Sequence, residues 1–362
     1  MTVPRITLLA TLLLTAPAAA QLQITPPAAI PSPSTEKQKP KEAAKEKPKT
    51  APHTITRKKE AAPAPKPSAS PSPAATVIPA PPTDNSNVDL VFGAYQRGQY
   101  KTAFDLAGAR AKTGDAKAMT MLGELYSNAM GIRRDYAKAV EWYKRASDAG
   151  DREAMFALAM MRIAGRGGPV DKGEAVKLMA SAAKLGEPKA AYNLALLYLD
   201  GQTLPQDVKR SAELLRQAAD AGLPEAQYAL ATFYKEGSGV PKDLDKAVRL
   251  LQAASLADNV DAEVEYAIAM FNGTGTPKNQ PAAVALLRKA SRQGSAIAQN
   301  RLAWVLINGM GATADKVEGF KWHLVAKTAG KGDPELDKQL ADLPADDRAK
   351  AEAAAKKWLG TK

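Results

Sequence analysis

Residues 187–222 read EPKAAYNLALLYLDGQTLPQDVKRSAELLRQAADAG, and this stretch decides the fold. Its first half places apolar residues at spacings of three and four, as in Ala190, Leu194 and Leu197, a pattern typical of an α-helix. The breaker GQTLP then interrupts the pattern, and a second helical run leads to Gly222. The stretch therefore predicts two helices joined by a short turn.

The same organisation recurs every 36 residues from residue 88 onward, with no insertion over six units. The fifth unit departs most, because Asp258 stands at the glycine position and Tyr266 where leucine is usual. Elsewhere three columns hold a small residue at one fixed period: Gly114, Gly150, Gly186, Gly222, Gly294 and Gly330; Ala118, Ala154, Ala190, Ala226, Ala262 and Ala298; and Ala146, Ala182, Ala218, Ala254, Ala290 and Ala326. This regularity predicts a stack of equal modules.

A single helix pair cannot bury its apolar face, so the units must stack on one another. We therefore expect an all-α fold, a right-handed α/α solenoid over residues 88–330, in which each repeat touches only its neighbours. A capping helix pair is expected within 88–113. Two polar capping helices are expected within 331–362, at 334–343 and 345–359, with Trp358 as the apolar anchor of the second.

The first 20 residues, MTVPRITLLATLLLTAPAAA, have the pattern of a secretory signal peptide. A single Arg5 precedes a short apolar run, and three alanines form the exit, so cleavage is expected before Gln21. The alternative, an uncleaved anchor, is disfavoured because a spanning helix needs about 20 apolar residues. The sequence thus predicts a periplasmic or secreted protein whose mature chain has no transmembrane segment.

Residues 21–87 differ sharply in composition from the repeats. They hold 15 of the 26 prolines, with 10 Lys/Arg against 5 Asp/Glu. Such a segment lacks the apolar residues for a core, and we expect a disordered Pro/Lys/Ala-rich linker. Two roles stay open: a solvated spacer, or a basic strap that binds anionic envelope polymers.

The residues available for chemistry are few. The chain of 362 residues has no cysteine and two histidines, which excludes disulfides and thiolate metal sites. His53 falls in the linker, and His323 lies in a helical column otherwise filled by packing residues. The glycines around 165–168 and 273–275 complete no phosphate-binding motif. The sequence predicts no catalytic residue, no metal and no cofactor. The formal net charge of +12 mixes both signs, and no nucleic-acid partner is expected.

The strings AAYNLALLYLDG at 190–201 and AQYALATFYKEG at 226–237 resemble the Sel-one-like repeat, a branch of the tetratricopeptide-like repeats. The resemblance covers about three-quarters of the chain. It implies a scaffold that binds other proteins. Some exported relatives bind the outer part of a sensor kinase, so regulation of an envelope signalling protein is one implied role. Cysteine-rich relatives are linked to β-lactam binding, but their disulfide framework is absent here.

The first helix of each unit is expected to line the concave side of the solenoid. Two columns on it become largely apolar in the middle units, as a peptide-binding groove requires. The expected partner-binding residues are Phe156, Met160, Tyr192, Leu196, Tyr228, Ile268 and Trp304. For the first column, Phe156 with Tyr192 and Tyr228, packing between repeats is an open alternative. The leading hypothesis is an exported, non-catalytic interaction scaffold. The alternatives are a cell-wall or polysaccharide binder and a β-lactam or cell-wall-active enzyme.

Overall fold

A computed structural model describes residues 89–360 of the chain. The predicted signal peptide, the predicted linker and His53 lie outside this part. The described residues form helices and no strand: α1 Leu90–Gln96, α2 Tyr100–Ala111, α3 Ala116–Asn128, α4 Tyr136–Asp148, α5 Arg152–Ala164, α6 Lys172–Lys184, α7 Pro188–Asp200, α8 Val208–Asp220, α9 Pro224–Glu236, α10 Leu244–Leu256, α11 Val260–Asn272, α12 Gln280–Arg292, α13 Ala296–Asn308, α14 Lys316–Thr328, α15 Pro334–Ala341 and α16 Ala345–Gly360.

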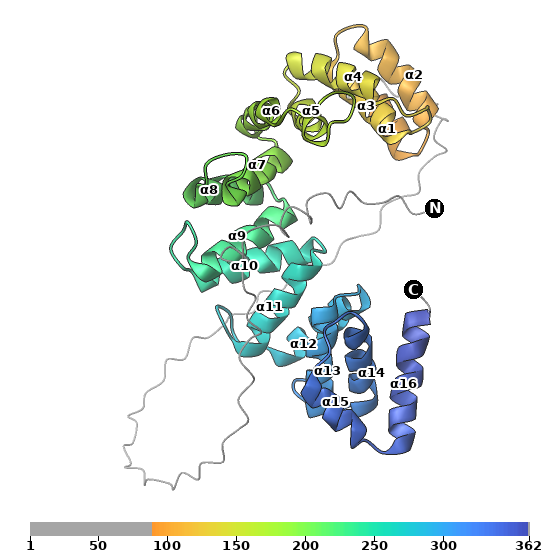
Figure 1. Cartoon of the computed structure of the whole chain (residues 1–362), viewed down its shortest axis with the longest axis vertical. Coiled ribbons are helices and arrows are strands. Elements are labelled where there is room, and N and C mark those ends of the chain that lie inside the picture. Colours follow the sequence, from red (N-terminus) through yellow and green to blue (C-terminus); the bar gives the residue numbers. More distant parts are fainter. Residues whose placement is uncertain (1–88, 361–362) are drawn as a thin grey trace, which may run out of the picture. The chain divides into compact units, whose positions relative to one another are not determined.

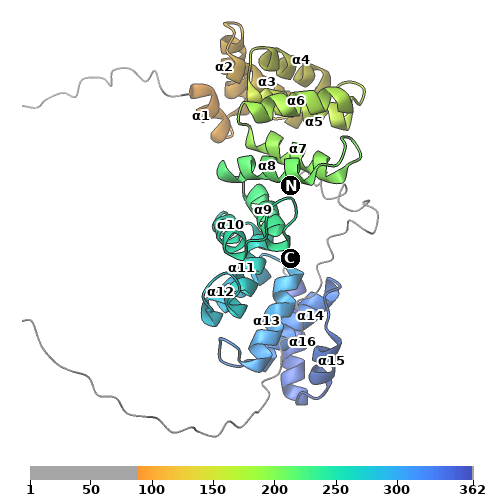
Figure 2. The same cartoon turned by 90° about the vertical axis from the view of Figure 1, so that its left-hand side faces the viewer.

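From α1 to α14, each helix packs on the helices before and after it in the chain, so the hairpins follow one another as a solenoid (Figures 1 and 2). The predicted all-α repeat fold is confirmed. We call α3, α5, α7, α9, α11 and α13 the A helices, and α4, α6, α8, α10, α12 and α14 the B helices. Each of them is 13 residues long, so the 36-residue period is kept in three dimensions.

Local sequence sets where the helices begin and end. Each B helix is preceded by an Asp or Asn whose side chain accepts a backbone N–H of the first turn, as Asp207 does from Arg210. Pro188 and Pro224 occupy the first turns of α7 and α9, where the missing N–H of proline costs no helical hydrogen bond. Most A helices end at a left-handed glycine such as Gly201, with φ 72°.

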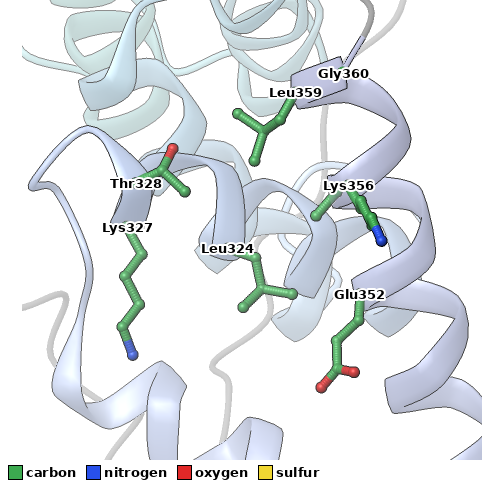
Figure 3. Close-up of a pocket in the computed structure, with 8 residues that line it drawn as sticks. Leu324, Lys327, Thr328, Glu352, Lys356, Leu359 and Gly360 are labelled. Carbon is green, nitrogen blue, oxygen red and sulfur yellow. The ribbon is translucent and has the colours of Figure 1, made fainter.

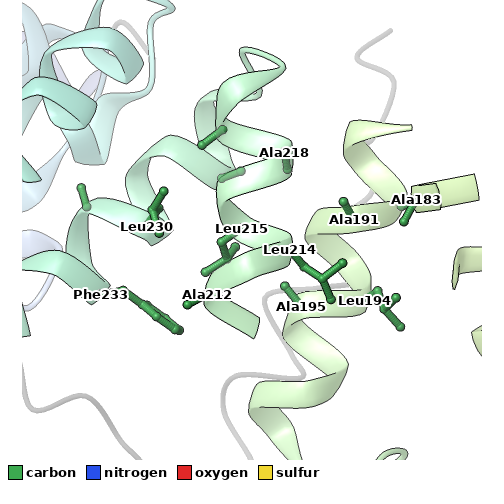
Figure 4. Close-up of a cluster of buried hydrophobic side chains, with 14 of the residues drawn as sticks. Ala183, Ala191, Leu194, Ala195, Ala212, Leu214, Leu215, Ala218, Leu230 and Phe233 are labelled. Atoms are coloured by element: carbon green, nitrogen blue, oxygen red, sulfur yellow. The ribbon is translucent and has the colours of Figure 1, made fainter. Parts of the chain in front are cut away.

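Alanine makes the helices pack closely. In the central units Ala191, Ala195, Ala212 and Ala218 are almost fully buried. Figure 4 shows Ala191 and Ala195 on α7 beside α8, and Ala212 with the larger Leu215 on the side of α8 that faces α9. Since a methyl group fills little space, the two helix backbones approach each other, and the leucines then complete the layer. The low aromatic content of 6% is therefore sufficient for this core.

The C-terminal end is closed by α15 and α16, with α16 packed on α14. The ring of Trp358 on α16 lies edge-on to that of Trp322, with centroids 5.1 Å apart. The ammonium group of Lys321 lies 4.1 Å from the Trp322 ring centroid and 5.1 Å from that of Trp358. His323 is fully buried, and its Nε2 is 2.8 Å from Oδ1 of Asp337 on α15. Both tryptophan and histidine thus join the capping helices to the last repeat.

A charged pair links B helices of successive repeats. Arg288 on α12 donates from Nη1 to both carboxylate oxygens of Glu318 on α14, at 2.7 Å each. Burial tends to raise the pKa of Glu318, but the hydrogen bond and charge of Arg288 outweigh it, and the pKa falls below its ordinary value of 4.5. The pair therefore stabilises the fold fully at pH values above the ordinary pKa of 4.5. This stabilisation is lost as the pH falls through the lowered pKa of Glu318.

The change Arg288→Gln is expected to lower the free energy of unfolding by about 1–2 kcal/mol at neutral pH, since both side chains are about one-third exposed and hydrogen bonds to charged groups are worth about 1.5–3 kcal/mol. Urea unfolding of the wild type and the variant, at neutral pH and near pH 3, measures this change in the free energy of unfolding. The difference between wild type and variant should shrink as the pH falls toward the lowered pKa of Glu318. A difference that grew on acidification would contradict this assignment.

Candidate partner-binding surface

The A helices carry all seven residues expected to bind a partner. Hydrogen bonds between side chains also connect one A helix to the next. Asp151 caps α5 by accepting from the N–H of Ala154 at 2.7 Å. Its Oδ1 also accepts from Oγ1 of Thr120 on α3 at 3.0 Å. One carboxylate therefore both starts an A helix and ties it to the preceding A helix.

The seven side chains are each partly buried, and none is fully exposed. Phe156, Met160, Tyr192 and Tyr228 pack against the central core, and Ile268 and Trp304 pack against the core of the last units. Leu196 is also partly buried, without belonging to either cluster. The structure thus aligns these residues along consecutive A helices, at contacts between repeats that leave part of each side chain accessible.

Two tyrosines of this surface have raised pKa values, and acidic residues of the next repeat contribute to both shifts. Burial raises the pKa of Tyr228 to about 12, and the charges of Glu265 and Asp261 on α11 add to the shift. Burial likewise raises the pKa of Tyr192, with Glu225 on α9 as the second cause. Tyrosine therefore stays neutral at these positions and contributes a ring and a hydroxyl group rather than a charge.

Trp304 has a structural contact as well as an accessible face. Its indole Nε1–H donates to Oδ2 of Asp333 at 2.9 Å, and Oδ1 of the same Asp333 accepts from the N–H of Glu335 at the start of α15. A variant of Trp304 would therefore disturb the C-terminal cap together with any bound partner. Leu196 and Met160 have no such polar contact and are better probes of the surface.

The sequence interpretation missed a row of charges on the same helices, because it followed only apolar columns. Lys235 on α9 donates to Oε2 of Glu265 on α11 at 3.0 Å. Arg301 follows on α13, at the position equivalent to Glu265 one repeat later, and Asp333 follows at the start of α15. Lys235 and Asp333 do not share the repeat position of Glu265 and Arg301, so a comparison of equivalent positions gives no signal for this row.

No group of three or more His, Cys, Asp or Glu side chains in residues 89–360 is placed to hold a metal ion. His323, the one histidine described, is enclosed and paired with Asp337. Among the same residues, no helix combines the length and apolar character needed to cross a membrane.

One open pocket of about 630 Å³ lies between α14 and α16 (Figure 3). Leu324 and Leu359 supply its apolar walls, and Glu352 and Lys356 are exposed on α16. Lys327, also on its rim, is held at 2.8 Å by Asp337. The charged groups stand at the rim rather than converging inside, so the pocket has the character of a surface depression.

The sequence profile described as Sel1 repeat matches residues 116–151, 152–187, 188–223, 224–259, 260–295 and 296–331. The crystal structure of a Sel1 repeat protein from Oxalobacter formigenes is similar, with 26% identity and a TM-score of 0.59, over 66% of this chain and 98% of that one. The protein c5321, a protective antigen of uropathogenic Escherichia coli with an SLR fold, shows 22% identity and a TM-score of 0.49, over 72% and 64%. No curated protein matches the sequence.

Proposed function

Because the chain belongs to the Sel1 repeat family, whose members generally mediate protein–protein interaction, we propose that it is a non-catalytic scaffold that binds a partner protein along its A helices. The observation that carries the proposal is the row of partly buried apolar and aromatic side chains on α5, α7, α9, α11 and α13. These side chains are held by packing between repeats, so little conformational entropy is lost when a partner docks on them.

The proposal extends to where the protein acts. The apolar run and the small-residue exit within residues 1–20 support export, and a periplasmic or secreted location follows from it. An exported scaffold of this kind would meet proteins of the cell envelope, and the outer part of a membrane-bound signalling protein is a suitable partner. The basic residues of 21–87 add a second contact, with anionic polymers of the envelope.

Site-specific photocrosslinking in intact cells tests the A-helix surface. A photoreactive residue replaces Met160 or Leu196 on A helices, and matched variants carry it at Lys177 or Arg249, which are exposed on the B helices α6 and α10. We expect a discrete crosslinked protein from the A-helix positions and none from the B-helix positions. The same adduct from all four positions, or an adduct from the B helices alone, would contradict the proposal.

A further inference from the structure

Arg301 is the one member of the charged row whose partner is missing. It lies in the interior of α13 and is partly buried. Among residues 89–360 it forms no hydrogen bond and no ion pair. Burial lowers the pKa of its guanidinium group, and the charges of Asp333 and Glu265 oppose the shift without cancelling it. The cation has thus lost part of its water without gaining a direct acceptor, an arrangement that costs free energy.

Both neighbouring carboxylates are occupied by other groups. Glu265 accepts from Lys235 at 3.0 Å, and its side chain is 25% exposed. Asp333 uses one oxygen for the indole of Trp304 and the other to cap α15. Each carboxylate is thus already engaged in a contact that fixes a neighbouring helix, and neither one is placed within hydrogen-bond distance of Arg301. The five N–H donors of a guanidinium group are well matched to a planar carboxylate supplied from outside.

Apolar side chains stand one helical turn from this row of charges. Trp304 follows Arg301 by three residues on α13, and Ile268 follows Glu265 by three residues on α11, so each pair shares a helix face. The surface therefore offers a cation next to an aromatic and an aliphatic side chain. Its complement is a peptide in which an acidic residue neighbours an apolar one.

We propose that Arg301 binds a side-chain carboxylate of the partner protein, whose adjacent apolar residue packs against Trp304 and Ile268, so that the scaffold selects acidic-apolar peptide segments. This rests on the proposed function and deepens it, because it assigns the chemistry of the bound segment. The alternation of sign along the row also sets the register. Glu265 on one side and Asp333 on the other repel a second acidic residue, so one carboxylate is accepted at this position.

Selection from a random-peptide phage library on the full chain tests the assignment. Three proteins are compared: the wild type, Arg301→Gln, and the control Arg292→Gln, which removes the same charge at the exposed end of α12. We expect peptides selected by the wild type and by the control to be enriched in Asp or Glu beside an apolar residue. The Arg301→Gln protein should lose this enrichment, with a thermal midpoint no lower than that of the wild type, because the side chain has no hydrogen-bonded partner to lose and its burial as a cation costs free energy.

Binding constants make the test quantitative. For a selected peptide, replacing its acidic residue by the amide should weaken binding to the wild type about tenfold, as expected for a charge-assisted hydrogen bond, and should change binding to Arg301→Gln little. The inference is overturned if the wild type and Arg301→Gln discriminate equally between the acidic peptide and its amide variant. It is also overturned if the selected peptides show no preference for acidic residues. If the peptides still require Leu196, shown by loss of binding in Leu196→Lys, the proposed A-helix function stands. An absence of selected peptides overturns the inference, and the crosslinking experiment then judges the proposed function alone.

Discussion

The substitution Gly239→Ala is expected to lower the free energy of unfolding by about 2–5 kcal/mol. A Cβ atom at this position would lie 2.5 Å from the carbonyl oxygen of Val208, the first residue of α8 in the preceding repeat. The obstacle is backbone, so no rotation of a side chain relieves it, and overpacking of this kind costs about 1–3 kcal/mol. The φ of +66° adds strain of about 1–2 kcal/mol for any residue with a Cβ.

The same close approach recurs between other successive repeats. A Cβ atom added to Gly275 would lie 2.5 Å from the carbonyl oxygen of Leu244. One added to Gly167 would likewise clash with the carbonyl oxygen of Tyr136. In each case the turn between an A helix and its B helix rests on the start of the previous B helix. The third unit is the exception among the six, since Thr203 takes this position in a turn of different sequence.

The matched control is Gly222→Ala. Its φ is +86°, but no atom lies within 4 Å of the added Cβ, so the strain is present without the clash. Urea unfolding followed by circular dichroism should place Gly222→Ala about 1–2 kcal/mol below the wild type and Gly239→Ala clearly lower. Equal losses in the two variants would show that the close approach between repeats contributes nothing.

The second large effect is expected for Lys289→Met, at about 2–3 kcal/mol. Lys289 on α12 lies 2.5 Å from Oε1 of Glu263, whose side chain is completely buried on α11, and 2.7 Å from Oδ1 of Asp258. Removing the cation leaves a buried carboxylate without its counter-charge. Fully buried pairs lose about 3–5 kcal/mol in this way, and the 40% exposure of the Lys289 side chain justifies the smaller figure.

A second substitution should rescue this variant. Glutamine occupies the position equivalent to Glu263 in the adjacent units, where Gln227 and Gln299 donate to the carbonyl oxygens of Ala219 and Ser291. In Lys289→Met with Glu263→Gln the new amide can donate in the same way, so most of the lost stability should return. Lys246→Met, which breaks an exposed pair on α10, is the control and should change the unfolding curve little. Failure of the rescue would mean that Lys289 acts through something other than Glu263.

The helices could be predicted from the sequence because their signals are local. The 3.6-residue periodicity, the capping residues and the glycines at the helix ends all act within one hairpin, and the repeat supplies each signal several times. Asp258 was identified as an irregularity from its column alone, and its φ of +58° confirms that it adopts the glycine conformation. The ion pair of Asp258 with Lys289 could not be predicted from the column, since Lys289 lies 31 residues away and is brought near by the stacking of two repeats.

The candidate site was predictable in outline only. The period places Phe156, Tyr192 and the other five residues in two columns of equivalent A-helix positions, but it does not say how much of each side chain a neighbouring repeat covers. The contact of Trp304 with Asp333 depends on α15, which lies outside the repeat pattern. The isolation of Arg301 likewise results from contacts that its two neighbours make with other residues. Such features require coordinates, because they depend on which of several nearby groups are paired.

The most direct test of the account is a structure of the full chain bound to the partner protein identified by crosslinking. We expect a segment of the partner to lie across α7, α9, α11 and α13, with a carboxylate at Arg301 and apolar contacts to Leu196 and Ile268. A partner seated on the B helices, or in the depression between α14 and α16, would contradict the assignment of the A helices as the binding surface.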